Sequence, residues 1–186
     1  MVNTRPVAVL YGGTFDPPHR GHQMIVDRLV SLPYVDKVIV TPAWLNPFKS
    51  HSVASPAQRL RWCRMLFDHP KVYVDPGEID AGKTVYTAQT VQRLERTYDL
   101  RYIAIGSDNL TAIETWYNFD RLNREKTWLV FERAGYETGY EKLREYRRLA
   151  LDVPVSSRAI RAGEHADALD PKIAPSVHTL LTKGTP

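Results

Sequence analysis

Two histidines, His19 and His22, stand three residues apart shortly after a glycine pair, Gly12-Gly13. Each imidazole can donate a hydrogen bond to a phosphate oxygen. The apolar run 7–11 before the glycines predicts a buried parallel strand. A strand that runs through glycines into a helix offers an anion unpaired backbone N–H groups and a favourable dipole. The segment therefore predicts a cradle for a nucleotide's phosphates, and chemistry on those phosphates.

Other roles for the histidine pair are less well supported. A metal site would need a third ligand, and spacing places none beside His19 and His22, so we expect no metal held by the protein. A dehydrogenase would need the G-x-G-x-x-G fingerprint, which the chain lacks. We also set aside a P-loop kinase.

The composition is that of an ordered globular chain. With 186 residues, 43% of them hydrophobic and 25% charged, a single domain over residues 1–186 is expected. No apolar run approaches the roughly 20 residues that cross a bilayer, so we expect no membrane association. The single Cys63 excludes a disulfide framework and is expected as a packed thiol. Residues 1–6 lack an apolar signal segment, so we expect a cytoplasmic protein.

The net charge of +4 raises the question of nucleic-acid binding. The basic residues, however, are scattered or fall on predicted helix faces. The two clearest groups are Arg59, Arg61 and Arg64, and Arg144, Arg147 and Arg148. We interpret both groups as solvated helix faces and expect no nucleic-acid partner, while a modest positive field suits a polyanionic small molecule.

The elements that must position the histidines alternate between strands and helices. Further apolar runs that predict strands occupy residues 37–41, 72–74, 102–106 and 128–131. Helical patterns separate them, so we expect an α/β fold with a Rossmann-like parallel sheet and helices on both faces. Ligands bind such sheets at the carboxyl ends of the strands. The turns at Gly12-Gly13 and Gly106-Ser107-Asp108 would open on one crevice if their strands are neighbours.

The first two helices have recognisable starts. The first should begin near His22. The second has Ser55 as its N-cap, Pro56 in its first turn and Gln58 to complete a capping box. The side chains expected on their buried faces are Ile25 and Leu29, then Leu60, Cys63 and Phe67.

A third helix should open at Thr87. It carries Val91, Leu94 and Tyr98 at helical spacing. The loop 42–54 joins the predicted strand 37–41 to the second helix. It is long for a compact domain, which is typical of functional loops.

Six ordered motifs carry a resemblance to a known family. Residues 12–22 are similar to the signature of the (T/H)xGH nucleotidylyltransferase superfamily, and residues 155–161 resemble its second phosphate motif, Ser-Ser-Thr-x-Ile-Arg. Residues 86–90, 105–108, 115–117 and 129–136 resemble one branch, the bacterial nicotinate-nucleotide adenylyltransferases. That branch condenses nicotinate mononucleotide with ATP to nicotinate adenine dinucleotide and pyrophosphate, with Mg²⁺ carried by the ATP phosphates. Because one phosphate attacks the other directly, no protein nucleophile is required.

The resemblance implies a role for each matching residue. The implied catalytic residues are His19, His22 and Arg161. The implied ATP contacts are Gly12, Gly13, Thr14, Phe15, His19, His22, Gly106, Asp108, Ser156, Ser157, Ile160 and Arg161. The implied mononucleotide contacts are Thr14, Phe15, Lys49, Tyr86, Thr87, Trp116 and Arg133. The histidines would hold the ATP phosphates, the serines would open a helix that favours anions, and Asp108 would meet ribose hydroxyls.

The residues expected around the base favour a carboxylate. Trp116 offers a flat face for a pyridine ring. Amides near Tyr86 and Thr87, at a helix start, can point at a carboxylate, so we expect nicotinate to be preferred over nicotinamide mononucleotide. The chain departs from the family pattern at Trp44, Phe48 and Arg158.

Two alternatives remain open at this point. One is another adenylyl- or cytidylyltransferase of the same superfamily, acting on phosphopantetheine or an alcohol phosphate. The other is a non-catalytic nucleotide- or RNA-binding module, which for a nucleic-acid ligand should lose affinity steeply with salt. A homo-oligomer is also left open.

Overall fold

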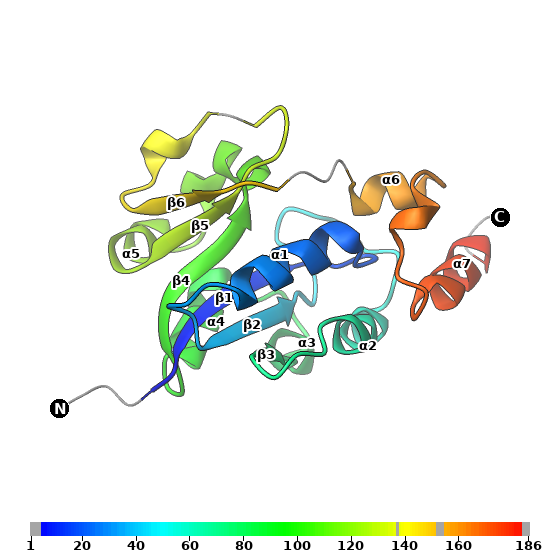
Figure 1. Ribbon diagram of the computed structural model, residues 1–186, viewed down its shortest axis with the longest axis horizontal. Coiled ribbons are helices and arrows are strands. Elements are labelled where there is room, and N and C mark those ends of the chain that lie inside the picture. The colour runs from blue at the N-terminus through cyan, green and yellow to red at the C-terminus, as the bar shows by residue number, and fades with distance from the viewer. Residues whose placement is uncertain (1–4, 137, 152–154, 184–186) are drawn as a thin grey trace.

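One six-stranded sheet forms the centre of the computed structural model, which describes residues 5–136, 138–151 and 155–183. The strands are β1 (Val7–Gly13), β2 (Lys37–Pro42), β3 (Val72–Val74), β4 (Asp99–Gly106), β5 (Thr127–Phe131) and β6 (Tyr146–Leu149). They pair in parallel in the order β3-β2-β1-β4-β5-β6, which confirms the Rossmann-like α/β fold (Figure 1). Because β1 pairs directly with β4, the turns after both strands open at the same edge of the sheet.

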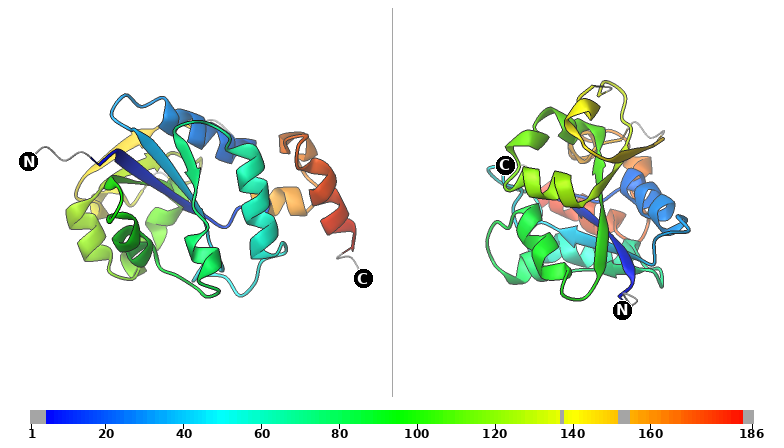
Figure 2. Two further views of the ribbon diagram at one scale, coloured as in Figure 1. Left: turned by 90° about the horizontal axis from the view of Figure 1, so that it is seen from below. Right: turned by 90° about the vertical axis from the view of Figure 1, so that its left-hand side faces the viewer.

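Helices cover both faces of this sheet. They are α1 (Arg20–Val30), α2 (Pro56–Leu66), α3 (Gly77–Asp80), α4 (Thr87–Leu94), α5 (Phe119–Glu125), α6 (Ser157–Arg161) and α7 (Ala174–Lys183). Short 3₁₀ turns occupy Ser107–Thr111, Ile113–Thr115, Tyr140–Lys142 and Ala166–Ala168. Figure 2 shows α1 on the face opposite the green helices, with α7 (red) beyond the end of the sheet.

Successive side chains of the strands point to opposite faces of the sheet and pack into two separate hydrophobic cores. Val9 and Val38 pack with Leu29 of α1, whereas Leu10 and Ile103 pack with α4 on the other face. Each such side chain contributes roughly 1.5–3 kcal/mol when fully buried. The sheet is thus held rigidly on both sides, which fixes the positions of the turns at its edge.

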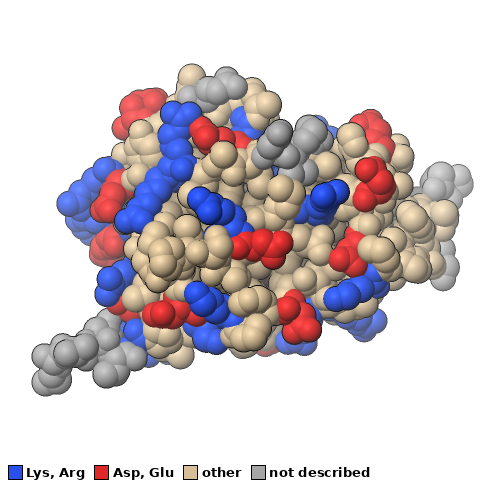
Figure 3. Space-filling view, viewed as in Figure 1, with Lys and Arg blue, Asp and Glu red and all other residues tan. Residues whose placement is uncertain are grey.

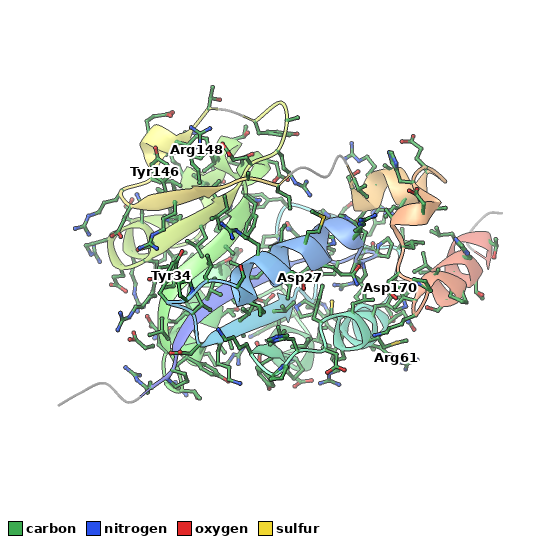
Figure 4. All side chains as sticks on the ribbon, in the orientation of Figure 1. Asp27, Tyr34, Arg61, Tyr146, Arg148 and Asp170 are labelled. Atoms are coloured by element: carbon green, nitrogen blue, oxygen red, sulfur yellow. The ribbon has the colours of Figure 1, made fainter. Side chains whose placement is uncertain are left out.

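A third cluster joins the C-terminal helices to α2. Trp62 is its centre, and the indole Nε1–H donates to Ser176 Oγ at 2.7 Å. Gln23 of α1 also donates to Asp170 at 2.9 Å. Asp170, labelled in Figure 4, precedes α7. These contacts place α6, with its serines and Arg161, beside the start of α1.

The helix limits correct the sequence-based expectations in three places. Helix α1 begins at Arg20 rather than near His22, because His19 is itself the N-cap. Ser55 caps α2 as predicted, accepting from the Gln58 N–H at 3.2 Å, but no return bond from the Gln58 side chain forms, so the capping box is only half present. Helix α4 begins at Thr87 as predicted yet ends at Leu94, and Tyr98 packs on the core from beyond it.

The first arginine group is only partly a solvated face. Arg61 and Arg64 on α2 are exposed as predicted, and Arg61 points away from the sheet (Figure 4). Arg59 is completely buried, so its assignment to solvent is wrong. Arg59 is buried because it lies one helical turn before Cys63, on the same side of α2 as Cys63 and next to the buried Leu60.

The second arginine group does not lie on a helix. Arg147 and Arg148 belong to β6 at the edge of the sheet, and Arg144 precedes it, so the helical assignment is wrong. Arg147 covers the Tyr34 ring at 4.4 Å, and Arg148 is paired with Glu132. On the face shown in Figure 3, basic and acidic side chains are interspersed.

Residues 77–84 match the P-loop pattern G-x-x-x-x-G-K-[ST], so setting aside a P-loop kinase rests on the structure and not on the sequence. The first four of these residues form α3 instead of an open loop. The Ala81 N–H is bonded to Gly77 and the Gly82 N–H to Ile79. The Arg93 guanidinium packs so closely on Gly77 that a Cβ there would lie 2.5 Å from Cζ. The backbone is therefore not arranged to wrap a phosphate.

Across the described ranges, every helix is too short or too polar to cross a membrane.

Candidate active site

Two cavities meet at the edge of the sheet where β1, β2 and β4 end. The first, here named the aromatic cavity, has a volume of about 310 Å³ and is lined by Tyr86, Trp116 and Tyr117 among others. The second, the basic cavity, has a volume of about 500 Å³ and is lined by both histidines and by the second phosphate motif. Phe48 lines both cavities. The turns after β1 and β4 lie at the same edge of the sheet, but Gly106, Ser107 and Asp108 line neither cavity, and this part of the chain reaches the aromatic cavity through Ile105 and Asn109.

Twelve of the seventeen predicted site residues line one of these cavities, and five line neither: Thr14, Phe15, Gly106, Asp108 and Ile160. Those lining the basic cavity are His19, His22, Lys49, Arg133, Ser156, Ser157 and Arg161. Those lining the aromatic cavity are Gly12, Gly13, Tyr86, Thr87 and Trp116. Thr14 lies next to the basic cavity, where its Oγ1 accepts from Lys49 Nζ at 3.3 Å. The Ile160 side chain is buried against α7, which leaves any ligand contact to its backbone.

The two histidines support each other at the start of α1. His19 Nδ1 accepts the Gly21 N–H at 3.2 Å, and His22 Nδ1 accepts the His19 N–H at 3.1 Å. Each neutral ring therefore carries its proton on Nε2. Phe15 packs edge-on against His22 with ring centroids 5.0 Å apart. The backbone thus fixes both rings and leaves two Nε2–H donors.

Both imidazoles are held in the neutral form. Burial, together with the smaller effect of the nearby Arg133 guanidinium, lowers the pKa of His19 to about 4. The pKa of His22 is also well below its usual value, through burial and the charges of His19 and Arg133. At neutral pH the pair therefore offers the basic cavity hydrogen-bond donors and no fixed charge.

Positive charge in the basic cavity comes from longer side chains. Among the described residues, its lining holds four positive side chains, Lys49, Arg133, Arg158 and Arg161, against the single carboxylate of Asp16. Partial burial and the Arg161 charge lower the pKa of Lys49. This crowding of like charges is relieved when a polyanion binds.

Two glycines of the predicted site leave room for a neighbouring side chain that packs against the backbone. A Cβ at Gly13 would lie 2.9 Å from the Phe15 ring, which folds back because Phe15 has a left-handed backbone with φ 51°. A Cβ at Gly106 would lie 2.4 Å from Asp108 Oδ1. Asp108 in turn lies 3.5 Å from the Arg133 guanidinium, so it connects the β4 turn to the basic cavity.

The second phosphate motif opens α6. Ser156 is the N-cap and accepts the Ala159 N–H at 3.1 Å. Ser157 Oγ donates to Pro17 O at 2.9 Å, and Arg161 donates to Asp16 O. These bonds tie α6 to the turn after β1, so both phosphate motifs face the same cavity.

The aromatic cavity is walled by the start of α4 and by the segment after β4. The Tyr86 N–H donates to Gln89 Oε1 at 3.0 Å, and the Tyr86 and Tyr117 rings lie 5.1 Å apart. Trp116 is partly buried. Its ring packs edge-on against Trp128, with the ring centroids 6.1 Å apart. Trp116 therefore lines the cavity and packs on the core at once.

Several lining residues were not predicted from the sequence. In the aromatic cavity they include Asn46, Glu78, Asn109 and Tyr117, and in the basic cavity Ser50, His51, Ser52, Val53 and Arg158. Most lie on loop 43–54, whose length marked it as functional while its contacts were unknown. Glu78 lies on α3, a one-turn helix with no apolar period to reveal it.

Three comparisons with known proteins agree with this geometry. Residues 10–163 match the model of a family described as cytidylyltransferase-like. The chain is 46% identical over 183 residues to a probable nicotinate-nucleotide adenylyltransferase of Sulfurovum sp. (strain NBC37-1), covering 97% of both chains. It is 34% identical to the protein of the same name from a Nitratiruptor species, covering 90% of this chain and 94% of that one.

Solved structures share the fold. The Plasmodium falciparum nicotinic acid mononucleotide adenylyltransferase complexed with NaAD superposes with a TM-score of 0.75 at 17% identity, covering 96% of this chain and 95% of that one. The same enzyme complexed with APC has a TM-score of 0.70 over the same shares of the two chains. Sequence and fold together show that the chain belongs to the cytidylyltransferase-like family and, within it, to the nicotinate-nucleotide adenylyltransferases.

Proposed function

We propose that this protein transfers the adenylyl group of ATP to nicotinate mononucleotide, forming nicotinate adenine dinucleotide and pyrophosphate. The observation that carries the proposal is the junction of the two cavities at the turn after β1, with Phe48 in both linings. A flat ring fits the aromatic cavity, and a triphosphate fits the basic cavity. The two reacting phosphates would then meet beside Gly13 and Thr14.

The reaction needs position and charge stabilisation more than a reactive side chain. A phosphate oxygen of the mononucleotide attacks the α-phosphorus of ATP, the bond from that phosphorus to the bridging oxygen breaks, and pyrophosphate leaves. His19 and His22 donate their Nε2–H groups to phosphate oxygens on which negative charge develops. Lys49 lies where the mononucleotide phosphate would approach, and Arg161 where the leaving pyrophosphate would lie. Alignment of two reactants can supply roughly 7–11 kcal/mol of the barrier.

Mg²⁺ is proposed as a cofactor that arrives on the ATP phosphates. No group of three acidic, histidine or cysteine side chains that could hold a metal exists in the described part of the chain. The Asp16 carboxylate already accepts two backbone N–H groups. The lining of the basic cavity therefore fits a metal ion that arrives on the nucleotide rather than one bound by the protein. When bound, the ion would neutralise charge on the phosphates.

The base would be selected at the start of α4. Trp116 offers the stacking face. The Tyr86 N–H is occupied by Gln89, so the positive end of α4 at Thr87 is what favours a carboxylate over a carboxamide. Glu78 lines the same cavity and would repel a carboxylate only when ionised.

A pyrophosphate-release assay tests the proposal. ATP is supplied with nicotinate mononucleotide, nicotinamide mononucleotide or phosphopantetheine, and CTP replaces ATP in a parallel set. We expect rapid release only with ATP and nicotinate mononucleotide. Release with another acceptor or with CTP would instead favour a different transferase of the superfamily, and no release with any pair would favour a binding module.

A further inference from the structure

The loop of residues 43–54 forms a wall of both cavities. Ala43, Asn46 and Pro47 line the aromatic cavity, and Ser50 and Val53 line the basic cavity. The distance between a ring in one cavity and a triphosphate in the other therefore depends on where this loop lies.

Arg59 of α2 holds the beginning of the loop. Its Nη1 donates to Ala43 O at 2.6 Å and to Thr14 O at 2.7 Å, and its Nη2 donates to Trp44 O at 2.7 Å. Its Nε donates to Ala54 O at 3.3 Å. One guanidinium thus joins the turn after β1, which carries Thr14, to both ends of the loop.

Asp16 holds the far end of the loop. Its Oδ2 accepts the Val53 N–H at 2.7 Å, and its Oδ1 accepts the Ala54 N–H at 2.9 Å. Asp16 also belongs to the turn after β1, and its carbonyl accepts from Arg161. The same turn that faces the phosphates therefore grips the loop directly.

Both side chains are charged and almost inaccessible to solvent. Arg59 is 0% exposed and Asp16 is 4% exposed. Burying charge is costly, and apolar residues of similar volume often stabilise a fold as well or better. Stability alone is therefore a weak reason for two buried charges at this place, whereas fixed backbone positions beside a reaction centre are a direct one.

We propose that Arg59 and Asp16 are positioning residues that clamp loop 43–54 to the turn after β1 and so set the alignment of the two phosphates. Neither touches the reacting atoms. Arg59 acts through Ala43, Trp44 and Thr14, and Asp16 acts through Val53 and Ala54. The kinetic part of this inference rests on the proposed function, while the loop contacts do not.

Proteolysis measures the clamp without any substrate. Lys49 is the lysine of loop 43–54 and is exposed, but a protease must draw the chain around the cleaved bond into an extended conformation, so release of the loop from its anchors should speed cleavage by a lysine-specific protease. Lys83, exposed in the turn after α3, is an internal control in the same chain. In Arg59→Lys, which keeps the charge but cannot reach four carbonyls, and in Asp16→Asn, we expect cleavage after Lys49 to accelerate about tenfold while cleavage after Lys83 is unchanged.

Kinetics measures the consequence for the reaction. In both variants we expect KM for nicotinate mononucleotide to rise about tenfold and kcat to fall by a similar factor, with KM for ATP changed by less than about threefold, because ATP is held mainly by α1 and α6. Lys126→Met is the matched control. Lys126 is also buried and donates to a backbone carbonyl, Leu100 O, at 2.7 Å, but it lines neither cavity, so its loss should lower the Tm and leave both KM values alone.

The outcomes separate the clamp from the function. Unchanged cleavage after Lys49 and unchanged KM values in folded Arg59→Lys and Asp16→Asn would overturn the clamp. Equal kinetic losses in Lys126→Met would reduce the role of the clamp to general stability and also overturn it. A wild-type enzyme without turnover would instead refute the proposed function, and the proteolysis would still decide whether the loop is clamped.

Discussion

The imidazole rings of His19 and His22 lie with their centroids 3.9 Å apart, and each Nδ1 accepts a backbone N–H at the start of α1. The two residues that cap the helix are therefore the same two that present Nε2–H donors to the basic cavity. Helix formation itself aims the donors.

Replacing His22 separates its capping role from donation. His22→Asn keeps a side-chain acceptor for the His19 N–H but removes the Nε2–H donor. We expect kcat to fall about 100- to 1,000-fold, as for the loss of one oxyanion donor, with a Tm within a few degrees of wild type. Steady-state kinetics and thermal unfolding measure the two effects.

His69→Asn is the control for this substitution. His69 Nδ1 also accepts a backbone N–H, from Lys71 at 3.1 Å, but His69 lines neither cavity. It should keep full turnover. Near-normal turnover in His22→Asn would remove this histidine from the mechanism.

Glu78 links mononucleotide affinity to pH. Burial raises its pKa from 4.5 to about 7; the Thr90 hydroxyl, donating at 2.7 Å, and Arg93 oppose the rise, and Asp75 adds to it. As the pH rises through 7, Glu78 ionises in the cavity that would receive the nicotinate carboxylate. We expect KM for nicotinate mononucleotide to rise severalfold between about pH 6 and pH 8, with no such rise for nicotinamide mononucleotide.

Glu78→Gln tests that prediction. The amide keeps an acceptor for the Thr90 hydroxyl and cannot ionise, so KM should no longer depend on pH in this range. The same ionisation affects stability. Because the folded-state pKa is the higher one, wild type loses free energy of unfolding as the pH rises from about 4.5 through 7, and the variant should not. A pH profile that is the same in both proteins would be evidence against a role for Glu78.

Trp116 should contribute mainly to mononucleotide binding. Its ring lines the aromatic cavity and also packs on Trp128, so Trp116→Ala loses both contacts. We expect KM for the mononucleotide to rise about tenfold with KM for ATP unchanged, together with a lower Tm. Trp116→Phe keeps a flat ring and should recover most of the affinity. If both variants lose stability but bind normally, Trp116 is only a core residue.

The base preference is a separate prediction. The Tyr86 N–H already donates to Gln89, so we assign the selection to the Thr87 N–H and the positive end of α4. A bond to a carboxylate is worth roughly 1–1.5 kcal/mol more than a bond to a neutral carboxamide. The ratio of kcat/KM for nicotinate over nicotinamide mononucleotide should therefore be at least about fivefold, and equal values would refute selection at the start of α4.

Most of the sheet and its loops could be predicted because buried parallel strands are continuous apolar runs. The run 72–74 has the same limits as β3, and the other four predicted strands lie within β1, β2, β4 and β5. Strand β6 was not predicted because its sequence, Tyr-Arg-Arg-Leu, carries no apolar run, and only Leu149 among its residues is buried. Its arginines pack on Tyr34 and pair with Glu132, contacts that depend on distant segments.

The candidate site shows a similar limit. The histidines could be predicted from their place between a glycine turn and a helix start, and Ser156 and Ser157 only from the resemblance of residues 155–161 to a family motif. The charge of Arg59 predicts an exposed side chain. Its spacing of four residues from Cys63, however, places it on the buried face of α2. The hydrogen-bond partners of Arg59 are backbone carbonyls, and a sequence does not show which carbonyls a side chain will reach.

The most direct measurement is a crystal structure of the protein with a non-hydrolysable ATP analogue and nicotinate mononucleotide. We expect the triphosphate to contact Nε2 of His19 and His22 and Arg161, the pyridine ring to stack on Trp116, and a mononucleotide phosphate oxygen to lie in line with the α-phosphorus. A triphosphate bound elsewhere, with neither imidazole touching the ligand, would contradict the account.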